Sequence, residues 1–136
     1  MKNYLAAAVA ALVWFLVWDN FLAGMLIGST LAQIPGIVAE VSKLWETVGD
    51  LFAALMLAGV YARVRGVYGV GAKNGAVFGV YAGLLINFPT WLFMTVYAGW
   101  PYAVTWTLTI ALTLSTVVAG AIIGTVYQTM GGAKTA

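Results

Sequence analysis

Hydrophobic residues dominate four long stretches of the chain, which are separated by short polar or glycine-rich segments. The stretches cover about residues 4–32, 48–68, 74–98 and 102–128. At a rise of about 1.5 Å per residue, each is long enough, or nearly so, to cross a hydrocarbon core of about 30 Å. The runs are continuous rather than alternating, which disfavours a β-barrel. The pattern predicts an all-α membrane protein with a single four-helix domain over residues 1–136.

The longest connection, the predicted outer loop 33–47, has a helical pattern of its own. After Pro35 and Gly36, charged residues occupy one side of this pattern, and apolar residues recur at spacings of three and four. The charged residues are Glu40, Lys43 and Glu46, and the apolar ones are Ile37, Val38, Val41, Leu44, Trp45 and Val48. This arrangement predicts a short amphipathic helix on the outer membrane surface or packed on a partner.

Composition and charge support the membrane assignment and give it an orientation. Only 7 % of the residues are charged, against roughly 25 % in soluble domains, which excludes a free soluble globule. In a four-helix topology, five of the six basic residues lie on one side, at Lys2, Arg63, Arg65, Lys73 and Lys134. The positive-inside rule then places both termini in the cytoplasm, and we expect the bacterial inner membrane. The basic residues are scattered at helix ends, so no nucleic-acid partner is predicted.

The residue types that the chain lacks narrow its chemistry. It has no His and no Cys, which excludes His-ligated haem, Cys-held iron–sulfur clusters and the usual zinc sites. The sequence has neither a catalytic triad nor the G-K-[ST] ending of a phosphate-binding loop. We therefore predict a protein that is not an enzyme and has no metal site. No cofactor is predicted, although Trp14 lies deep enough to contact a lipid tail, a quinone or a pigment.

Small residues recur every fourth position and predict close helix packing. In lipid, helices associate through close backbone approach, which such stripes permit. The third helix carries Gly71, Gly75, Gly79 and Gly83; the second carries Ala54, Ala58 and Ala62; the fourth carries Gly120 and Gly124. The spacing leaves open whether these stripes pack within the chain or against another subunit.

Polar residues at membrane depth form the candidate site. Asp19, Asp50 and Asn87 lie roughly 21 to 25 Å from the cytoplasmic ends of their helices, so they share one layer with Asn20 and Thr90. A carboxylate is costly in lipid and should face the bundle interior, a cavity or the interface. Two interpretations remain open: Asp19 is a structural hydrogen-bond acceptor near the outer interface, or Asp19 and Asp50 line a proton or cation site.

A four-helix chain with an acidic residue in its first helix, Asp19, superficially resembles the small multidrug-resistance transporters. The Gly120 and Gly124 pair resembles the glycine-bearing fourth helix of that family. The larger outer loop and the flanking residues Trp18 and Asn20 depart from the family pattern, so the sequence assigns no family.

These observations favour a non-catalytic accessory or scaffold subunit of a larger inner-membrane complex, with membrane lipids and other integral membrane subunits as partners. One alternative is a small oligomeric proton- or cation-coupled transporter or channel that uses Asp19, Asp50 and Asn87. A third hypothesis is a lipid- or quinone-binding membrane protein.

Overall fold

The helices of the computed structural model follow the four apolar stretches. It describes residues 1–34 and 42–131. The helices are α1 (Lys2–Val17), the π-helical segment η1 (Trp18–Leu22), α2 (Ala23–Leu31), α3 (Lys43–Tyr68), α4 (Ala72–Ala98) and α5 (Tyr102–Gly131). Because α1, η1 and α2 are continuous, they form one candidate span, and α3, α4 and α5 are each long and apolar enough to cross a membrane. The prediction of an all-helical chain with four membrane-length helices is confirmed.

The predicted surface helix in the outer loop is wrong for the part of the chain that the structure describes. α3 begins at Lys43, so Lys43, Leu44 and Trp45 belong to the first turns of a long helix. The helix is not interrupted there because Ser42 already provides the extended N-terminal residue, and no proline follows it before residue 68. The first half of the predicted surface helix, at residues 35–41, lies outside the described residues.

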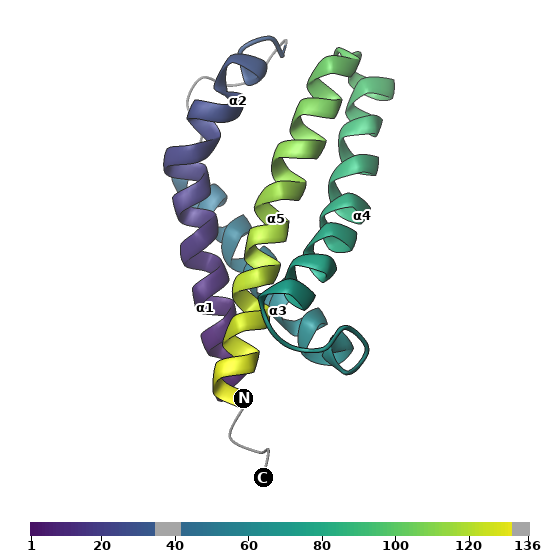
Figure 1. Ribbon diagram of the computed structural model, residues 1–136. Helices are drawn as coiled ribbons and strands as arrows, with labels where there is room; N and C mark the ends of the chain where they lie inside the picture. The colour runs from purple at the N-terminus through teal and green to yellow at the C-terminus, as the bar shows by residue number, and fades with distance from the viewer. Residues whose placement is uncertain (35–41, 132–136) are drawn as a thin grey trace.

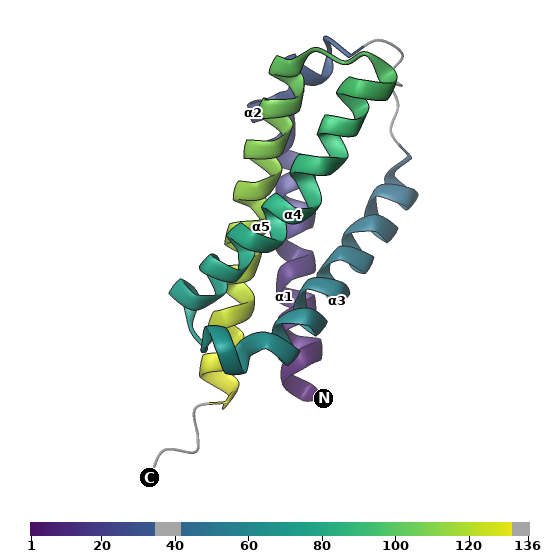
Figure 2. The same cartoon turned by 90° about the vertical axis from the view of Figure 1, so that its right-hand side faces the viewer.

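The four spans pack unequally. α4 and α5 are antiparallel and pack along their length, while α1 contacts both α3 and α5 (Figure 1). α3 packs mainly on α1 and makes far fewer contacts with α4 and α5, as the rotated view shows (Figure 2). Met1 and the end of α5 lie at the same end of the bundle as the turn between α3 and α4.

Glycines allow α4 and α5 to approach each other at backbone distance. A Cβ atom added to Gly75 would clash with the backbone of Gly120, and one added to Gly124 would clash with the carbonyl oxygen of Gly71. The amide of Gly71 donates a hydrogen bond of 2.9 Å to the carbonyl oxygen of Gly124, which joins the two helices directly. The glycine stripe of α4 therefore faces α5 of the same chain. Small side chains allow such contacts where lipid provides no hydrophobic driving force.

Alanines provide the equivalent surface between α1 and α3. Ala54 and Ala58 on α3 are fully buried in one cluster with Ala7 and Ala11 of α1. Ala62 is partly buried at the edge of the same cluster. Larger apolar residues close to these alanines in the chain, such as Val9 and Val13, are exposed. Small residues therefore mark the surface along which α1 and α3 meet.

Candidate functional site

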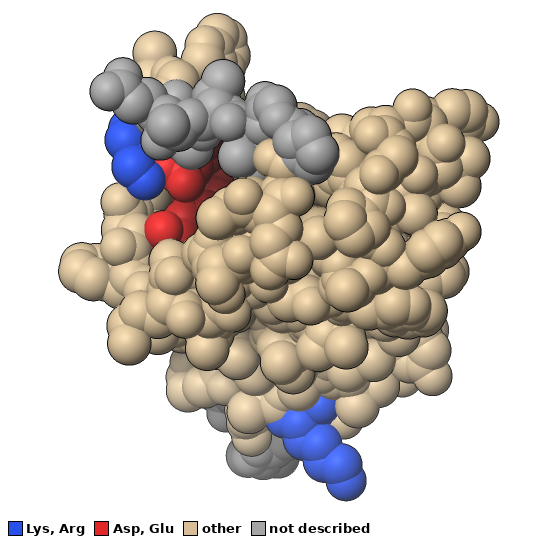
Figure 3. Space-filling model, turned by 90° about the horizontal axis from the view of Figure 1, so that it is seen from above, with Lys and Arg blue, Asp and Glu red and all other residues tan. Residues whose placement is uncertain are grey.

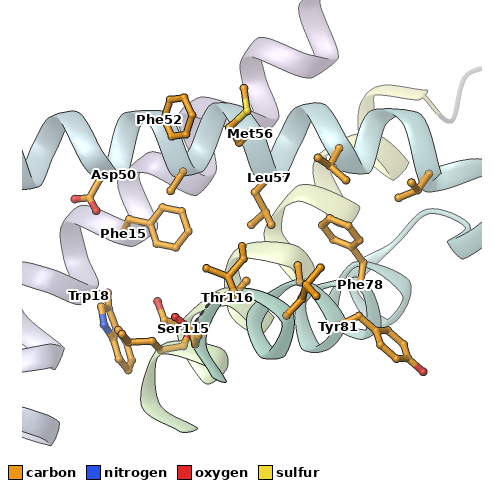
Figure 4. Close-up of a pocket in the computed structure, with 18 of the residues that line it drawn as sticks. Phe15, Trp18, Asp50, Phe52, Met56, Leu57, Phe78, Tyr81, Ser115 and Thr116 are labelled. Carbon is orange, nitrogen blue, oxygen red and sulfur yellow. Dashed lines mark hydrogen bonds between the residues drawn. The ribbon is translucent and has the colours of Figure 1, made fainter. Parts of the chain in front are cut away.

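The main cavity of the bundle lies between α1, α3, α4 and α5 and has a volume of about 660 Å³. Most of its lining is aromatic or aliphatic, and Figure 4 shows side chains from all four helices around it. Examples are Phe15 of α1, Met56 and Leu57 of α3, and Phe78 and Tyr81 of α4. Binding sites for small molecules in proteins have this size and this mainly apolar character.

The cavity exists because α3 packs along α1 and diverges from α4. The residues that line it on the facing sides of α3 and α4 are strongly exposed: Phe52 is 64 % exposed, Met56 50 %, Tyr81 62 % and Leu85 77 %. The opening therefore lies between α3 and α4, on the lateral surface of the bundle. For helices that span a membrane, this surface faces the lipid tails.

Aromatic side chains close the cavity at the end near the α3–α4 turn. The ring of Phe78 packs edge-on against Tyr61, with centroids 5.2 Å apart, and against Tyr68 at 5.7 Å. The Tyr61 hydroxyl is 2.8 Å from the carbonyl oxygen of Gly69 and donates to it. This bond ties α3 to the turn, where Gly69 has a left-handed backbone with φ of 84°. The closed end is therefore anchored to the backbone.

The opposite end of the cavity is polar. Asp19, Asp50 and Asn87 all line it, although they come from η1, α3 and α4. The carboxyl groups of Asp19 and Asp50 lie close enough to act on each other. Seen from the end where α3 begins, acidic side chains gather beside a basic one (Figure 3). The structure therefore brings three of the five predicted polar residues to one place.

The charges around this carboxyl pair do not balance. Lys43 and Glu46 lie close enough on α3 to act on both carboxyl groups. The Lys43 ammonium is 2.6 Å from a Glu46 carboxylate oxygen, so this cation already has an acidic partner. Among the residues that the structure describes, three carboxyl groups thus share a single ammonium, and acidic groups outnumber basic ones at the polar end of the cavity.

The π-helical segment positions Asp19. A π-helix inserts an extra residue into a turn, and such segments often occur at functional sites. Here the insertion lies at Trp18–Leu22, directly after the part of α1 that packs on α5. The indole Nε1 of Trp14 donates to the backbone oxygen of Ser115 at 3.0 Å and to its hydroxyl at 3.2 Å. This contact anchors α1 one turn before the insertion.

Two buried polar atoms at this end have no hydrogen-bond partner among the described residues. They are Oδ2 of Asp50 and Nε1 of Trp18. Trp18 is only 6 % exposed, and both residues line the cavity. Buried polar atoms are nearly always hydrogen-bonded in proteins, so these two atoms mark where an additional polar group would be accommodated.

Two predicted site residues lie elsewhere. Asn20 is exposed, and its side-chain amide donates to the carbonyl oxygen of Leu16 at 2.9 Å. Thr90 is also exposed, and its hydroxyl donates to the carbonyl oxygen of Ile86 at 2.6 Å. Both side chains therefore hydrogen-bond to the backbone of their own helix and do not line the cavity. Sequence reasoning missed Ser115, which lines the cavity from α5.

Comparisons with protein families, curated proteins and solved structures find no match to this chain. Within residues 1–34 and 42–131, no three His, Cys, Asp or Glu side chains come together as a metal site would require.

Proposed function

We propose that the protein binds a lipophilic small molecule between its helices. The apolar part of the molecule occupies the cavity, and its polar group lies at the end that carries Asp19 and Asp50. The observation that carries this proposal is the cavity of about 660 Å³, which is apolar along most of its wall and polar at one end. A membrane amphiphile has the same division into an apolar and a polar part.

The lateral opening supplies a route for such a ligand. Phe52 and Met56 on α3 and Tyr81 and Leu85 on α4 are exposed and line the cavity at this opening. In a bilayer, a lipophilic molecule passes between these rims from the lipid and never has to cross water. We place the protein in the bacterial inner membrane, with both termini in the cytoplasm. The clustering of Arg63, Arg65 and Lys73 around the α3–α4 turn supports this orientation.

Ligand binding accounts for the geometry better than a purely scaffolding role. An accessory subunit that packs through its small-residue stripes needs those stripes to be free to receive another protein. Gly75 and Gly79 instead lie against α5, and Ala54 and Ala58 lie against α1. The accessory-subunit role and transport of a proton or cation both remain predictions. Co-purification in a mild detergent tests the first, and flux into proteoliposomes tests the second.

The experiment is a binding measurement with a neutral probe and a variant that fills the cavity. The probe is radiolabelled dodecanol, and the protein is held in phosphatidylcholine nanodiscs, with the signal of empty nanodiscs subtracted. Ala53 lines the cavity at its exposed edge, so Ala53→Trp places an indole inside it. The matched control is Leu51→Trp, on the same helix at a position that is 44 % exposed and outside the cavity.

We expect saturable dodecanol binding at one site per chain in the wild-type protein and in Leu51→Trp. Ala53→Trp should lose this binding and retain the helical circular dichroism of the wild type. Binding that is not saturable, or that survives in Ala53→Trp, contradicts the proposal.

A further inference from the structure

We infer that the ligand is a lipophilic primary amine, held as an ammonium ion by Asp19 and Asp50 with its hydrocarbon chain in the cavity. This inference rests on the proposed lipophile site and identifies the chemical class of its occupant. Three features support it: the charge around the carboxyl pair, the buried Oδ2 atom of Asp50 that has no partner among the described residues, and the apolar wall.

The basic residues of α3 leave the carboxyl pair without a cation of its own. Lys43 is the basic side chain near the pair, and its ammonium is bound to Glu46. The next basic residue along α3 is Arg63, which lies about 20 Å further along the helix axis from Asp50. The polar end of the cavity therefore has an excess of negative charge. A charged carboxylate at membrane depth is costly unless a cation compensates it, and a bound ammonium ion supplies that cation.

The hydrogen-bonding capacity of the site indicates which cation fits. An ionised carboxylate only accepts hydrogen bonds, and a primary ammonium group carries three donors. The carboxyl groups of Asp19 and Asp50 are the acceptors at this end of the cavity. The buried Oδ2 atom of Asp50, which has no donor among the described residues, is one of these acceptors. A quaternary ammonium has the charge without the donors, and an alcohol has one donor without the charge.

The remaining wall suits a hydrocarbon chain. From the polar end, the lining continues over Phe15, Met56 and Leu57 to the closed end at Phe78. Trp18 borders the polar end with an indole that is almost fully buried.

The test compares three probes that share a twelve-carbon chain: dodecylamine, dodecanol and dodecyltrimethylammonium. Binding is measured in zwitterionic nanodiscs at a fixed pH, again with empty nanodiscs subtracted. Asp50→Asn removes the charge and preserves the shape of the side chain. The control is Asn20→Ala, because Asn20 is next to Asp19 in the chain but is exposed, bonds to its own helix and does not line the cavity.

Hydrogen bonds to charged groups contribute enough to change affinity at least about tenfold. We therefore expect dodecylamine to bind at least about tenfold more tightly than either other probe. Asp50→Asn should abolish this preference and leave dodecanol binding unchanged, which also shows that the variant is folded. Asn20→Ala should retain the preference.

Two results overturn the inference and leave the proposed function intact. One is dodecanol binding that depends on the cavity and is as tight as amine binding. The other is an amine preference that persists in Asp50→Asn. Equal binding of dodecylamine and dodecyltrimethylammonium overturns the assignment to a primary amine. If no probe binds in a way that Ala53→Trp abolishes, the proposed function fails, and the inference fails with it.

Discussion

The contact between α4 and α5 gives a sharp prediction for Gly79. In Gly79→Ala, the new Cβ atom would lie 2.6 Å from the carbonyl oxygen of Thr116 and 2.7 Å from the Cα atom of Val117. Both partners are backbone atoms, so rotation of a side chain cannot relieve the contact. Carbon and oxygen atoms in close helix contacts stay about 3.3 to 3.6 Å apart. The two helices must therefore separate, or their backbones must distort.

The expected cost follows from two opposing effects. Overpacking of a tight interface costs about 1 to 3 kcal/mol. Replacing glycine by alanine inside a helix contributes about 0.5 to 1 kcal/mol in the opposite direction. We expect Gly79→Ala to lower the free energy of unfolding by about 1 to 2 kcal/mol. The matched control is Gly24→Ala on α2, where no described atom lies within 4 Å of the added Cβ; there only the favourable helix effect remains.

The assay is reversible unfolding by SDS titration in mixed micelles, followed by circular dichroism. Gly79→Ala should unfold at a lower SDS fraction than the wild type, and Gly24→Ala at the same fraction or a higher one. If Gly79→Ala is as stable as Gly24→Ala, then α4 and α5 do not approach each other at backbone distance. The reasoning about the glycine stripe would then be refuted.

Two further predictions concern the α3–α4 turn and the orientation. Tyr61→Phe removes the hydrogen bond to Gly69 and should lower the free energy of unfolding by about 0.5 to 1.5 kcal/mol in the same titration. The control Tyr102→Phe, at a side chain that is 67 % exposed, should leave the free energy of unfolding unchanged. An equal loss in both variants would contradict the anchoring role of Tyr61. Because the chain has no cysteine, a single introduced cysteine is the only site that a maleimide can label. In intact cells, a membrane-impermeant maleimide should label Ser42→Cys. It should label Val70→Cys only after lysis. The reverse labelling pattern would contradict cytoplasmic termini.

The helix positions could be predicted from the sequence because the hydrophobic stretches are long and continuous. The structure extends the predicted second helix toward its start, from residue 48 to Lys43. The sequence predicts a helix from Lys43 to Trp45 whether this segment belongs to a separate surface helix or to the start of the second span. Periodicity alone cannot distinguish a surface helix from the first turns of a longer one.

The depth of the polar residues was predictable, but the directions in which their side chains point were not. A constant rise per residue placed Asp19, Asp50 and Asn87 in one layer, and the structure brings them to one end of the cavity. Asn20 and Thr90 lie at the same depth, but they point outward and bond to their own helices. The direction of each side chain depends on how its helix is rotated, and the π-helical insertion changes that rotation within the first span.

The cavity itself had no signal in the sequence. In a soluble protein, an apolar stripe shows which face of a helix is buried, but in lipid both faces are apolar. The size of the residues carried the relevant information: Ala54 and Ala58 mark where α3 meets α1. The departure of α3 from α4, which opens the cavity, depends on packing among all the helices.

The most direct test of the proposed function is an NMR measurement on methyl-labelled methionine. Met56 lines the cavity, whereas Met25 and Met94 lie outside it and are 84 % and 39 % exposed. The protein carries ¹³C-methyl methionine in deuterated lipid nanodiscs, and the dodecyl probe is protonated. We predict nuclear Overhauser contacts between the probe chain and the Met56 methyl group that exceed those at Met25 and Met94 and disappear in Ala53→Trp. Equal contacts at all three methionines would show that the probe is dissolved in the lipid, which would contradict a binding site between the helices.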